Sequence, residues 1–407
     1  MISFQKPDAE QFFRTYNITH FTVNKDETKL VMNSNLNGKF NLWAMDLPNT
    51  YPYPLTFQDQ NSQFVKFDPE NRYLLTGFDN DGDENFQIYS LPIAGGKPHP
   101  VLTGEKHEKY FFADLSEDGG RLYYMTSKEN PQFLDVRCRN LKTEDDNLLL
   151  SGKDSAVFLA GVSPEETNFA FIKQQANTFM LGYIKHGDEE ICLTPDENEV
   201  HTVTDVAFVD ENRVLFVTNY KEEFSYLATY DLEQRRFEPV LHLENESITG
   251  LKWHKDTRTA FLVTEKGVSD YLHAFKIDDK SRTAVELPLD NVQQLHVADS
   301  GTLYLLGRSA TKPFNLYKKS TDGPWVALTD NRLLGISESD MVEPEVVTYA
   351  SYDGKPIESL LFCAKENVAN GYTIFWPHGG PQAAERKFFR GLFQFLIGRG
   401  YNIFAPN

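Results

Sequence analysis

The stretch "VKFDPENRYLLT", residues 65–76, alternates apolar and polar side chains, turns through a polar segment and then alternates again. That order is typical of a β-hairpin. The pattern recurs at steps of 44–48 residues, measured between corresponding turn positions. The other six copies are "FTVNKDETKLVM" (21–32), "ADLSEDGGRLYY" (113–124), "AGVSPEETNFAF" (160–171), "VAFVDENRVLFV" (206–217), "LKWHKDTRTAFL" (251–262) and "LHVADSGTLYLL" (295–306). A repeat of this length predicts a fold built from stacked copies of one small β unit.

Each hairpin is followed by a third apolar stretch, such as "FNLWAMDL" (40–47), and often by a shorter fourth, such as "HPVLT" (99–103). Four short strands per unit, seven times over, are typical of a seven-bladed β-propeller. An α-solenoid is excluded because apolar residues recur at every second position rather than every 3.6. A β-helix would have a much shorter repeat. We therefore expect an all-β, seven-bladed β-propeller over residues 18–335.

Residues 1–17 form an N-terminal extension ahead of the first repeat. Within it, "PDAEQFFRTY" (7–16) predicts a short helix. Pro7 suits its first turn, where the missing N–H leaves no hydrogen bond unmade.

The composition favours a folded protein in a reducing compartment. The net charge is −19, which repels phosphate backbones and anionic lipid, so nucleic-acid and membrane partners are disfavoured. Cys138, Cys192 and Cys363 are odd in number and lie far apart, which argues against a disulfide framework. The first residues lack the apolar run of a signal peptide, and no stretch is long enough for a membrane span. A cytoplasmic location is expected.

No motif indicates a cofactor or metal ion. The sequence contains no HExxH, no paired CxxC and no glycine-rich nucleotide loop. The segment "DNDGDEN" (79–85) spaces Asp79, Asp81 and Asp83 as a calcium loop does. However, Glu84 stands where that loop needs glycine, so a solvated hairpin tip is the favoured interpretation and a calcium site the alternative.

From residue 340 onward the repeat stops and a different pattern begins. "EPEVVTYASYDGKPIESLLFCAK" (343–365) predicts a hairpin that turns at Asp353–Gly354. "YTIFWP" (372–377) is a continuous apolar run, as expected for a strand buried on both faces of a parallel sheet. An amphipathic helix that Gly400 can end precedes a second buried strand, "YNIFAP" (401–406). The apolar stripe of the helix is Phe389, Leu392, Phe393 and Leu396.

The turn "PHGGP" (377–381) lies between the first strand and the helix. Acyl transfer builds negative charge on a carbonyl oxygen, and fixed backbone N–H donors at that point accelerate it by roughly 10²–10³. Gly379 and Gly380 can offer such donors because no Cβ blocks close approach. Pro381 has no N–H and cannot donate. A plain glycine turn is the alternative interpretation.

These segments together resemble the prolyl oligopeptidase family of serine peptidases, most closely its acylaminoacyl-peptidase-like branch. "PHGGP", "GYNIFAPN" (400–407) and "YASYDGKPIESLLF" (349–362) resemble the opening of that family's α/β-hydrolase domain, and "NGKFNLWAMDL" (37–47) resembles its blades. The resemblance covers essentially the whole chain. It implies that residues 340–407 begin an α/β-hydrolase (peptidase) domain and that a propeller gates access of short peptides to the active site. It also favours Gly380 as the oxyanion-hole donor, with Gly379 beside it.

The catalytic triad of such an enzyme is not expected in this chain. In α/β-hydrolases the order is serine, acid and then histidine, so His378 is expected to support the loop rather than to act as the base. No G-x-S-x-G occurs, since "GVSPE" (161–165) and "GRSAT" (307–311) lack the second glycine. We expect a truncated or partial chain that is inactive by itself, from a parent that hydrolyses short peptides through an acyl-enzyme. The alternative is a non-catalytic propeller that binds partner proteins and carries a remnant hydrolase segment. A homo-oligomer stays possible in either case.

Overall fold

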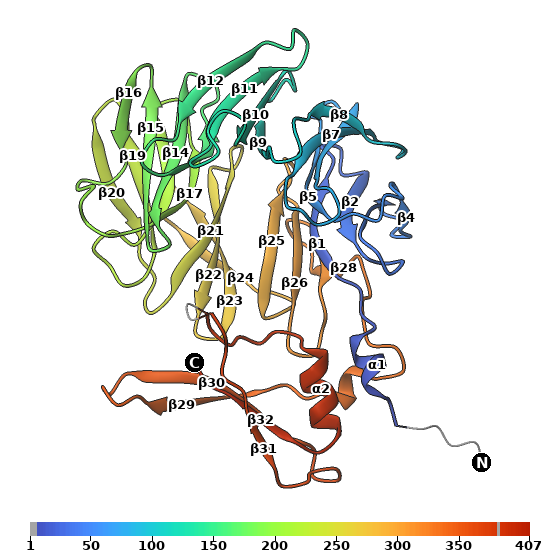
Figure 1. Cartoon of the computed structure of the whole chain (residues 1–407). Helices are drawn as coiled ribbons and strands as arrows, with labels where there is room; N and C mark the ends of the chain where they lie inside the picture. The colour runs from blue at the N-terminus through green and yellow to red at the C-terminus, as the bar shows by residue number, and fades with distance from the viewer. Residues whose placement is uncertain (1–5, 381–382) are drawn as a thin grey trace.

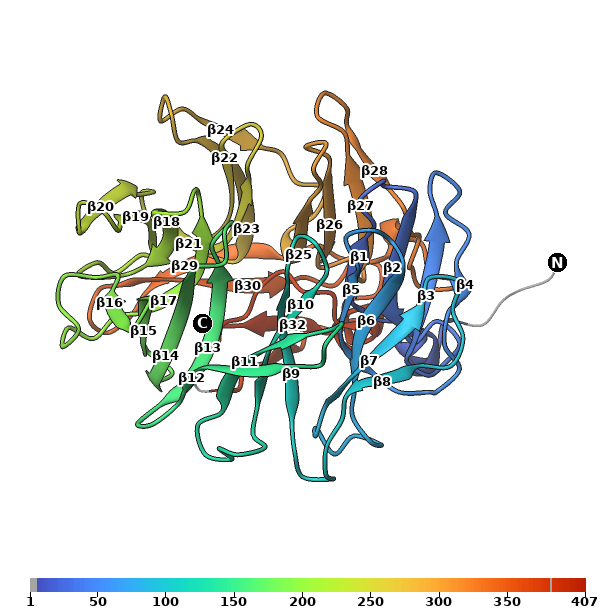
Figure 2. The same cartoon turned by 90° about the horizontal axis from the view of Figure 1, so that it is seen from above.

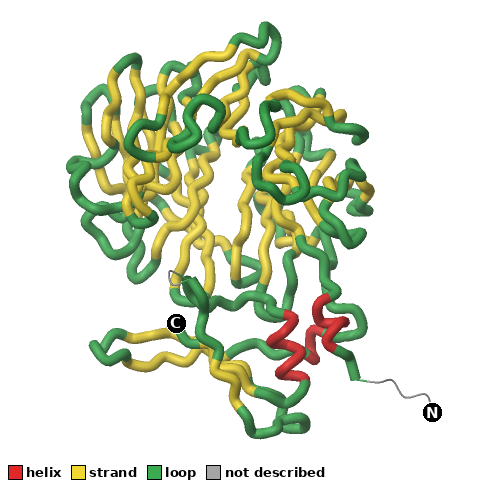
Figure 3. Tube along the Cα trace, in the orientation of Figure 1, coloured by secondary structure: helices red, strands yellow, loops and turns green. Residues whose placement is uncertain are grey.

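The computed structural model describes residues 6–380 and 383–407. Residues 18–327 form seven four-stranded antiparallel sheets in succession, each with its strands in chain order. The α-helices of the described chain lie beside the separate terminal sheet (Figure 3). The first sheet contains β1 (Ile18–Val23), β2 (Lys29–Ser34), β3 (Asn41–Asp46) and β4 (Tyr53–Pro54).

The remaining six sheets repeat this meander. The second and third contain β5 (Ser62–Phe67), β6 (Tyr73–Phe78), β7 (Gln87–Pro92), β8 (His99–Leu102), β9 (Tyr110–Leu115), β10 (Arg121–Thr126), β11 (Asp135–Asn140) and β12 (Asp146–Ser151). The fourth and fifth contain β13 (Ala156–Val162), β14 (Asn168–Ala176), β15 (Phe179–His186), β16 (Glu189–Cys192), β17 (Val203–Phe208), β18 (Arg213–Thr218), β19 (Tyr226–Asp231) and β20 (Arg236–Leu241). The sixth and seventh contain β21 (Ser247–His254), β22 (Thr259–Lys266), β23 (Ser269–Lys276), β24 (Arg282–Val285), β25 (Asn291–Val297), β26 (Leu303–Arg308), β27 (Asn315–Lys319) and β28 (Trp325–Ala327).

The sheets follow one another around a common axis, with the seventh beside the first (Figures 1 and 2). A separate apolar cluster fills the space between each pair of neighbours, including the seventh and first. A single sheet cannot bury both of its faces, so stacking around a ring is the stable arrangement. The architecture is that of a β-propeller, as the hairpin repeat predicted.

The seventh and first sheets meet without exchanging a strand. The side chain of Gln294 on β25 accepts a hydrogen bond from the Phe21 N–H at 3.0 Å and donates one to the Phe21 carbonyl at 2.8 Å. Beside it, Tyr304 of β26 packs against β1 and donates to Glu27 at 2.7 Å. Side chains thus close this seam in place of a shared strand.

Helix α1 (Ala9–Phe13) packs against the terminal segment and not against the ring. Asp8 caps it by accepting from the Gln11 N–H, so Pro7 precedes the cap and lies outside the first turn where it was predicted. Phe12 meets Phe395 edge to face with ring centroids 5.7 Å apart. The N-terminal extension therefore links the start of the chain to its end.

The terminal segment forms one mixed sheet beneath the ring (Figure 1). Its strands lie in the order β29 (Glu345–Ala350), β30 (Pro356–Phe362), β32 (Asn402–Ala405) and β31 (Thr373–Phe375). The predicted hairpin is present as β29–β30, and Gly354 and Gly400 have φ values of 84° and 93°. β31 and β32 are parallel and are joined through helix α2 (Gly391–Gly398). A short 3-10 turn, Glu338–Asp340, precedes the sheet.

Two predictions for this segment were wrong. β31 is not buried on both faces: it pairs only with β32, and Tyr372 and Phe375 are 70% and 64% exposed. No second layer covers that face within the described residues. The helix begins at Gly391, because Arg390 before it is extended, so Phe389 lies outside the helix. Its buried face consists of Phe393, Ile397 and Gln394, while Leu392 and Leu396 are half-buried.

Candidate functional site

The glycine turn leaves the sheet directly after β31. The Trp376 N–H donates to the Phe404 carbonyl at 2.8 Å, which extends the parallel pairing by one step. Gly380 has a φ of 136°, in the region that favours glycine. Gly379 and Gly380 are both exposed, and neither amide has an acceptor among the described residues. The turn therefore leaves backbone donors open to a ligand.

His378 is half-buried, and its Nδ1 lies 2.9 Å from the carbonyl oxygen of Gly379. This contact ties the ring to the turn itself. Pro381, which was predicted to lack a donor in the turn, lies outside the described residues. In the part of the chain that the structure describes, no serine hydroxyl is hydrogen-bonded to a histidine ring.

One buried acid–histidine–hydroxyl cluster occurs elsewhere, in the sixth sheet. His273 Nε2 lies 2.7 Å from Oε1 of Glu246, and the hydroxyl of Thr264 donates to that same oxygen. In a catalytic triad the imidazole lies between the hydroxyl and the acid. Here both groups contact one carboxylate oxygen, and all three side chains are buried. The cluster therefore ties β22 to β23 and does not activate a nucleophile.

The segment that follows the turn is clamped to the ring by ion pairs. Arg386 contacts Asp270 at 2.5 Å and Glu265 at 3.0 Å, at the hairpin between β22 and β23. Lys387 contacts Asp290 at 3.2 Å, just before β25. The Asp270 carboxylate is only 4% exposed, so this clamp is desolvated and geometrically fixed. Burial raises the pKa of Glu265, against the lowering effect of Arg386.

Glu385 makes contacts within the terminal segment itself. Its carboxylate is 2% exposed and accepts from Arg390 at 3.0 and 2.9 Å, and its backbone is bonded to the Asn407 side chain. Arg308 of β26 packs nearby, with its guanidinium 3.8 Å from the ring centroid of Phe388. Burial lowers the pKa of Arg308 to about 10, with a further contribution from Arg390 and Arg386. The segment is thus packed, charged and fixed against the ring.

A cavity of about 370 Å³ lies at this end of the ring. Its walls come from the beginnings of β21 and β25, from Asp205 of β17 and from Arg386. The terminal segment therefore reaches this cavity through Arg386, six residues after Gly380.

Charged side chains on the first strands of several sheets influence one another here: Lys66 of β5, Asp114 of β9, Asp205 of β17, Lys252 of β21 and His296 of β25. Burial raises the pKa values of Asp114 and Asp205, which Lys66 and Lys252 partly counteract. Burial also lowers the pKa of His296 to about 4, and the same two lysines add to this effect. Both lysines are exposed, so the channel holds charge in contact with water.

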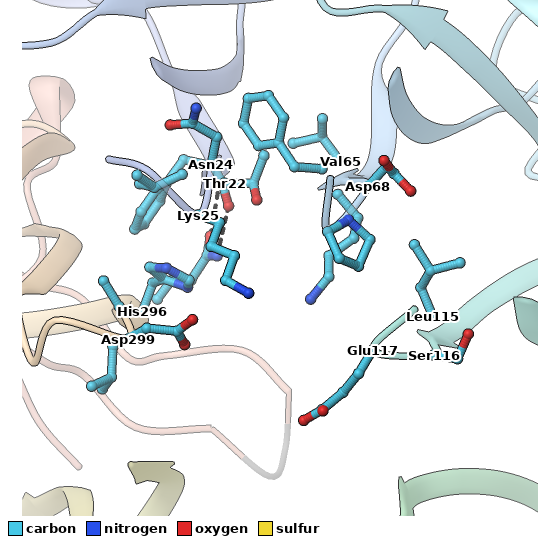
Figure 4. A pocket seen from close by; sticks show the side chains of 18 of the residues that line it. Thr22, Asn24, Lys25, Val65, Asp68, Leu115, Ser116, Glu117, His296 and Asp299 are labelled. Carbon is cyan, nitrogen blue, oxygen red and sulfur yellow. Dashed lines mark hydrogen bonds between the residues drawn. The ribbon is translucent and has the colours of Figure 1, made fainter. Parts of the chain in front are cut away.

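The far end of the channel opens between the turns that join the first and second strands of the sheets. Two cavities of about 420 and 490 Å³ lie there. Figure 4 shows Lys25, Glu117 and Asp299 pointing into the first of them.

The sequence indicated the glycine turn but not its surroundings. The clamp joins Arg386 to Asp270, 116 positions apart, and nothing in the local pattern pairs them. The alternation within first strands marked Lys66 and Lys252 as polar positions, although not as members of one channel.

Among residues 6–380 and 383–407, no helix is long and apolar enough to cross a membrane. The same residues contain no group of three or more potential metal ligands. Asp83 of the acidic loop accepts hydrogen bonds from the N–H groups of Asn80 and Asn85, as a hairpin tip does.

No family model and no curated protein matches this sequence. Solved structures do. A structure from a mechanistic analysis of two prolyl endopeptidases is similar with a TM-score of 0.79 and 14% identity over 98% of this chain. A puromycin-hydrolysing peptidase of Mycobacterium tuberculosis is similar with a TM-score of 0.80 and 14% identity, also over 98%. This chain spans 62% and 66% of those two chains. At such low identity the likeness concerns the fold, which is that of these peptidases over the matched length.

Proposed function

We propose that this chain supplies the substrate-gating propeller and one wall of the active site of a cytosolic serine peptidase of the prolyl oligopeptidase family. Residues 18–335 are its seven-bladed propeller, and residues 340–407 begin its α/β-hydrolase domain. The substrates are short peptides, and the acylaminoacyl-peptidase-like branch is the proposed subgroup. The observation that carries this proposal is a fold shared with two peptidases over nearly the whole chain, combined with a glycine turn whose two amides are exposed and without an acceptor among the described residues.

In this proposal the Gly380 N–H, with Gly379 beside it, binds the oxyanion of the tetrahedral intermediate. An oxyanion donor acts most strongly where the charge develops, and its loss costs about 10²–10³ in kcat. His378 holds the turn through its contact with the Gly379 carbonyl. The nucleophile, the acid and the base are supplied from outside these 407 residues, so the chain alone is inactive. The propeller restricts substrates to peptides that fit its openings.

The test is to read the coding sequence beyond Asn407 and to label both forms with a fluorophosphonate. A downstream G-x-S-x-G followed by an aspartate and a late histidine, with labelling of the longer form only, supports the proposal. In that form Gly380→Ala should lower kcat by at least tenfold, because the residue must keep a φ of 136°. An in-frame stop, or a longer form that stays unlabelled, would favour the non-catalytic interaction module. A specific serine adduct on the 407-residue chain would overturn the proposal that the triad lies outside it.

A further inference from the structure

One ion pair crosses the distal mouth of the channel, at the end away from the terminal sheet. Lys255 lies on the turn between β21 and β22, and Glu117 lies on the turn between β9 and β10. Their Nζ and Oε1 atoms are 3.2 Å apart, although the residues are 138 positions apart in the sequence. The third and sixth sheets lie on opposite sides of the ring (Figure 2). The pair therefore spans the opening and is not a contact between neighbouring sheets.

The two distal cavities lie on either side of this pair. Apart from shared residues, the first cavity is lined mainly by the first, second and seventh sheets, and the second mainly by the fourth, fifth and sixth. Both have Glu117 and Lys255 in their walls, together with Leu115, Ser116, Val297 and Asp299. The mouth is thus divided into two halves of about 420 and 490 Å³.

We propose that Lys255 and Glu117 form a bar across the distal mouth that excludes bulky chains and admits only narrow, extended ones through either half. The proposal concerns passage through the ring and does not depend on the proposed catalysis. In it, Lys255 and Glu117 set the size limit at this entrance, and nothing in the sequence pattern predicted that they pair.

The bar is weak enough to open. Both side chains are long and exposed, at 66% for Lys255 and 82% for Glu117. Such a pair favours its closed form by about fivefold at most, and salt screens it. The hydrogen bond with Glu117 raises the pKa of Lys255, and Asp299 and Asp256 add to this, so the ammonium stays charged. The bar should therefore respond to ionic strength.

A zero-length cross-link tests whether the two side chains meet. A carbodiimide activates the Glu117 carboxyl, the Lys255 amine attacks it, and an amide forms as the activator leaves as its urea. Mass spectrometry of the digest should show the Lys255–Glu117 peptide pair, less at 1 M salt than at 20 mM. Glu117→Gln should abolish it, while the Lys387–Asp290 pair serves as an internal control. Absence of the Lys255–Glu117 product under conditions that give the control product would overturn the bar.

Passage is tested by the reactivity of a cysteine placed beneath the bar. Lys66 is exposed and lines the first cavity, so Lys66→Cys is introduced after Cys192 and Cys363 are replaced by serine. Lys255→Glu sets two like charges across the mouth and should speed labelling by a 5-kDa polyethylene glycol maleimide at least threefold. The rate of labelling by the small reagent N-ethylmaleimide should change by less than twofold. The exchange Lys255→Glu with Glu117→Lys should restore the slow rate.

The matched control is Lys39→Glu, which disrupts an exposed pair with Asp59 away from the mouth. It should leave both labelling rates unchanged. Equal rates for the large reagent in the parent and in Lys255→Glu would refute the bar, as would failure of the charge exchange to restore exclusion.

Discussion

At the scale of single residues, His20 and His296 should make the folded chain sensitive to acid. Burial lowers the pKa of both to about 4, and Nε2 of His20 is buried with no hydrogen-bond partner among the described residues. In the unfolded chain each titrates near its ordinary value of about 6.5. Between these values the unfolded state binds more protons, so stability is complete above pH 6.5 and is lost as the pH falls toward 4.

We predict that His296→Gln reduces the loss of unfolding free energy between pH 7 and pH 4.5 by about 1–3 kcal/mol. This range follows from about 1.4 kcal/mol for each unit by which the pKa is lowered. Urea unfolding at several pH values measures it. Asp114, Asp205 and Glu265 have raised pKa values and act in the opposite direction, so the difference between variant and parent is the informative quantity. His99→Gln, at an exposed histidine, is the control, and its unfolding free energy should depend on pH as that of the parent does. Parallel curves for the parent and His296→Gln would contradict the prediction.

At the scale of elements, one side chain on β25, that of Gln294, makes two hydrogen bonds to the backbone of β1. Gln294→Ala removes both hydrogen bonds to the Phe21 backbone and leaves a buried N–H and carbonyl without partners. The cost should be about 1–3 kcal/mol of unfolding free energy. Chemical denaturation measures it, and hydrogen exchange at Phe21 should accelerate with it. Gln293→Ala, at the exposed neighbour on the same strand, should change stability by less than about 0.5 kcal/mol. Equal effects at both positions would show that the seam is held by apolar packing alone.

The contact between the two helices depends on a glycine at the start of α2. A Cβ on Gly391 would lie 2.1 Å from the carbonyl oxygen of Phe12, whereas a Cβ on Gly398 would come no closer than 4.0 Å to the Phe12 ring. Gly391→Ala should therefore displace α1 and lower the free energy of unfolding by about 1–3 kcal/mol, which lowers the melting temperature. Gly398→Ala should be neutral or stabilising, since alanine is the better helix former. Equal melting temperatures for the two variants would mean that α1 does not pack on α2 in solution.

The elements that the sequence predicted well are those whose neighbours repeat. In the ring, the period of two within each hairpin reports the burial of one face against the next sheet, so the alternation around Val65 and Leu74 located β5 and β6. The terminal segment has no such redundancy. The run around Phe375 is apolar in composition but lies on an edge strand, and exposure depends on what packs above it. The predicted stripe of α2 began too early, at Phe389, because the apolar spacing gave no sign that Arg390 is extended.

At the scale of the whole molecule, the glycine turn could be found from local sequence because its chemistry is local. Two small residues after a strand identify Gly379 and Gly380. The position of the segment that follows the turn was not predictable, because it depends on the contact between Arg386 of that segment and Asp270 of the ring. Contacts between distant segments of this kind decide what the turn can face, and only the assembled structure contains them.

The two parts of the molecule should differ in their resistance to local opening. Every ring sheet is covered on both sides by apolar clusters, whereas Val346, Tyr352, Tyr372 and Phe375 of the terminal sheet are exposed. Local opening is cheapest where few apolar contacts are lost. We predict that limited trypsin digestion cuts at Lys365 before any site in the ring, and that amides of β29 exchange at least tenfold faster than those of β26.

Edge position alone can also speed amide exchange, and an edge strand of the ring serves as the control for it. β20 is paired on one side only, as β29 is, yet it belongs to a stacked sheet. If β29 and β20 exchange at the same rate, the difference from β26 is due to edge position alone. If β29 is the faster of the two, the missing apolar cover is the cause, and Asp270→Asn should widen the gap because breaking a buried ion pair costs about 3–5 kcal/mol. Trypsin resistance that is equal in the terminal sheet and the ring would contradict the prediction, because it would require a protective cover that this surface does not have among the described residues.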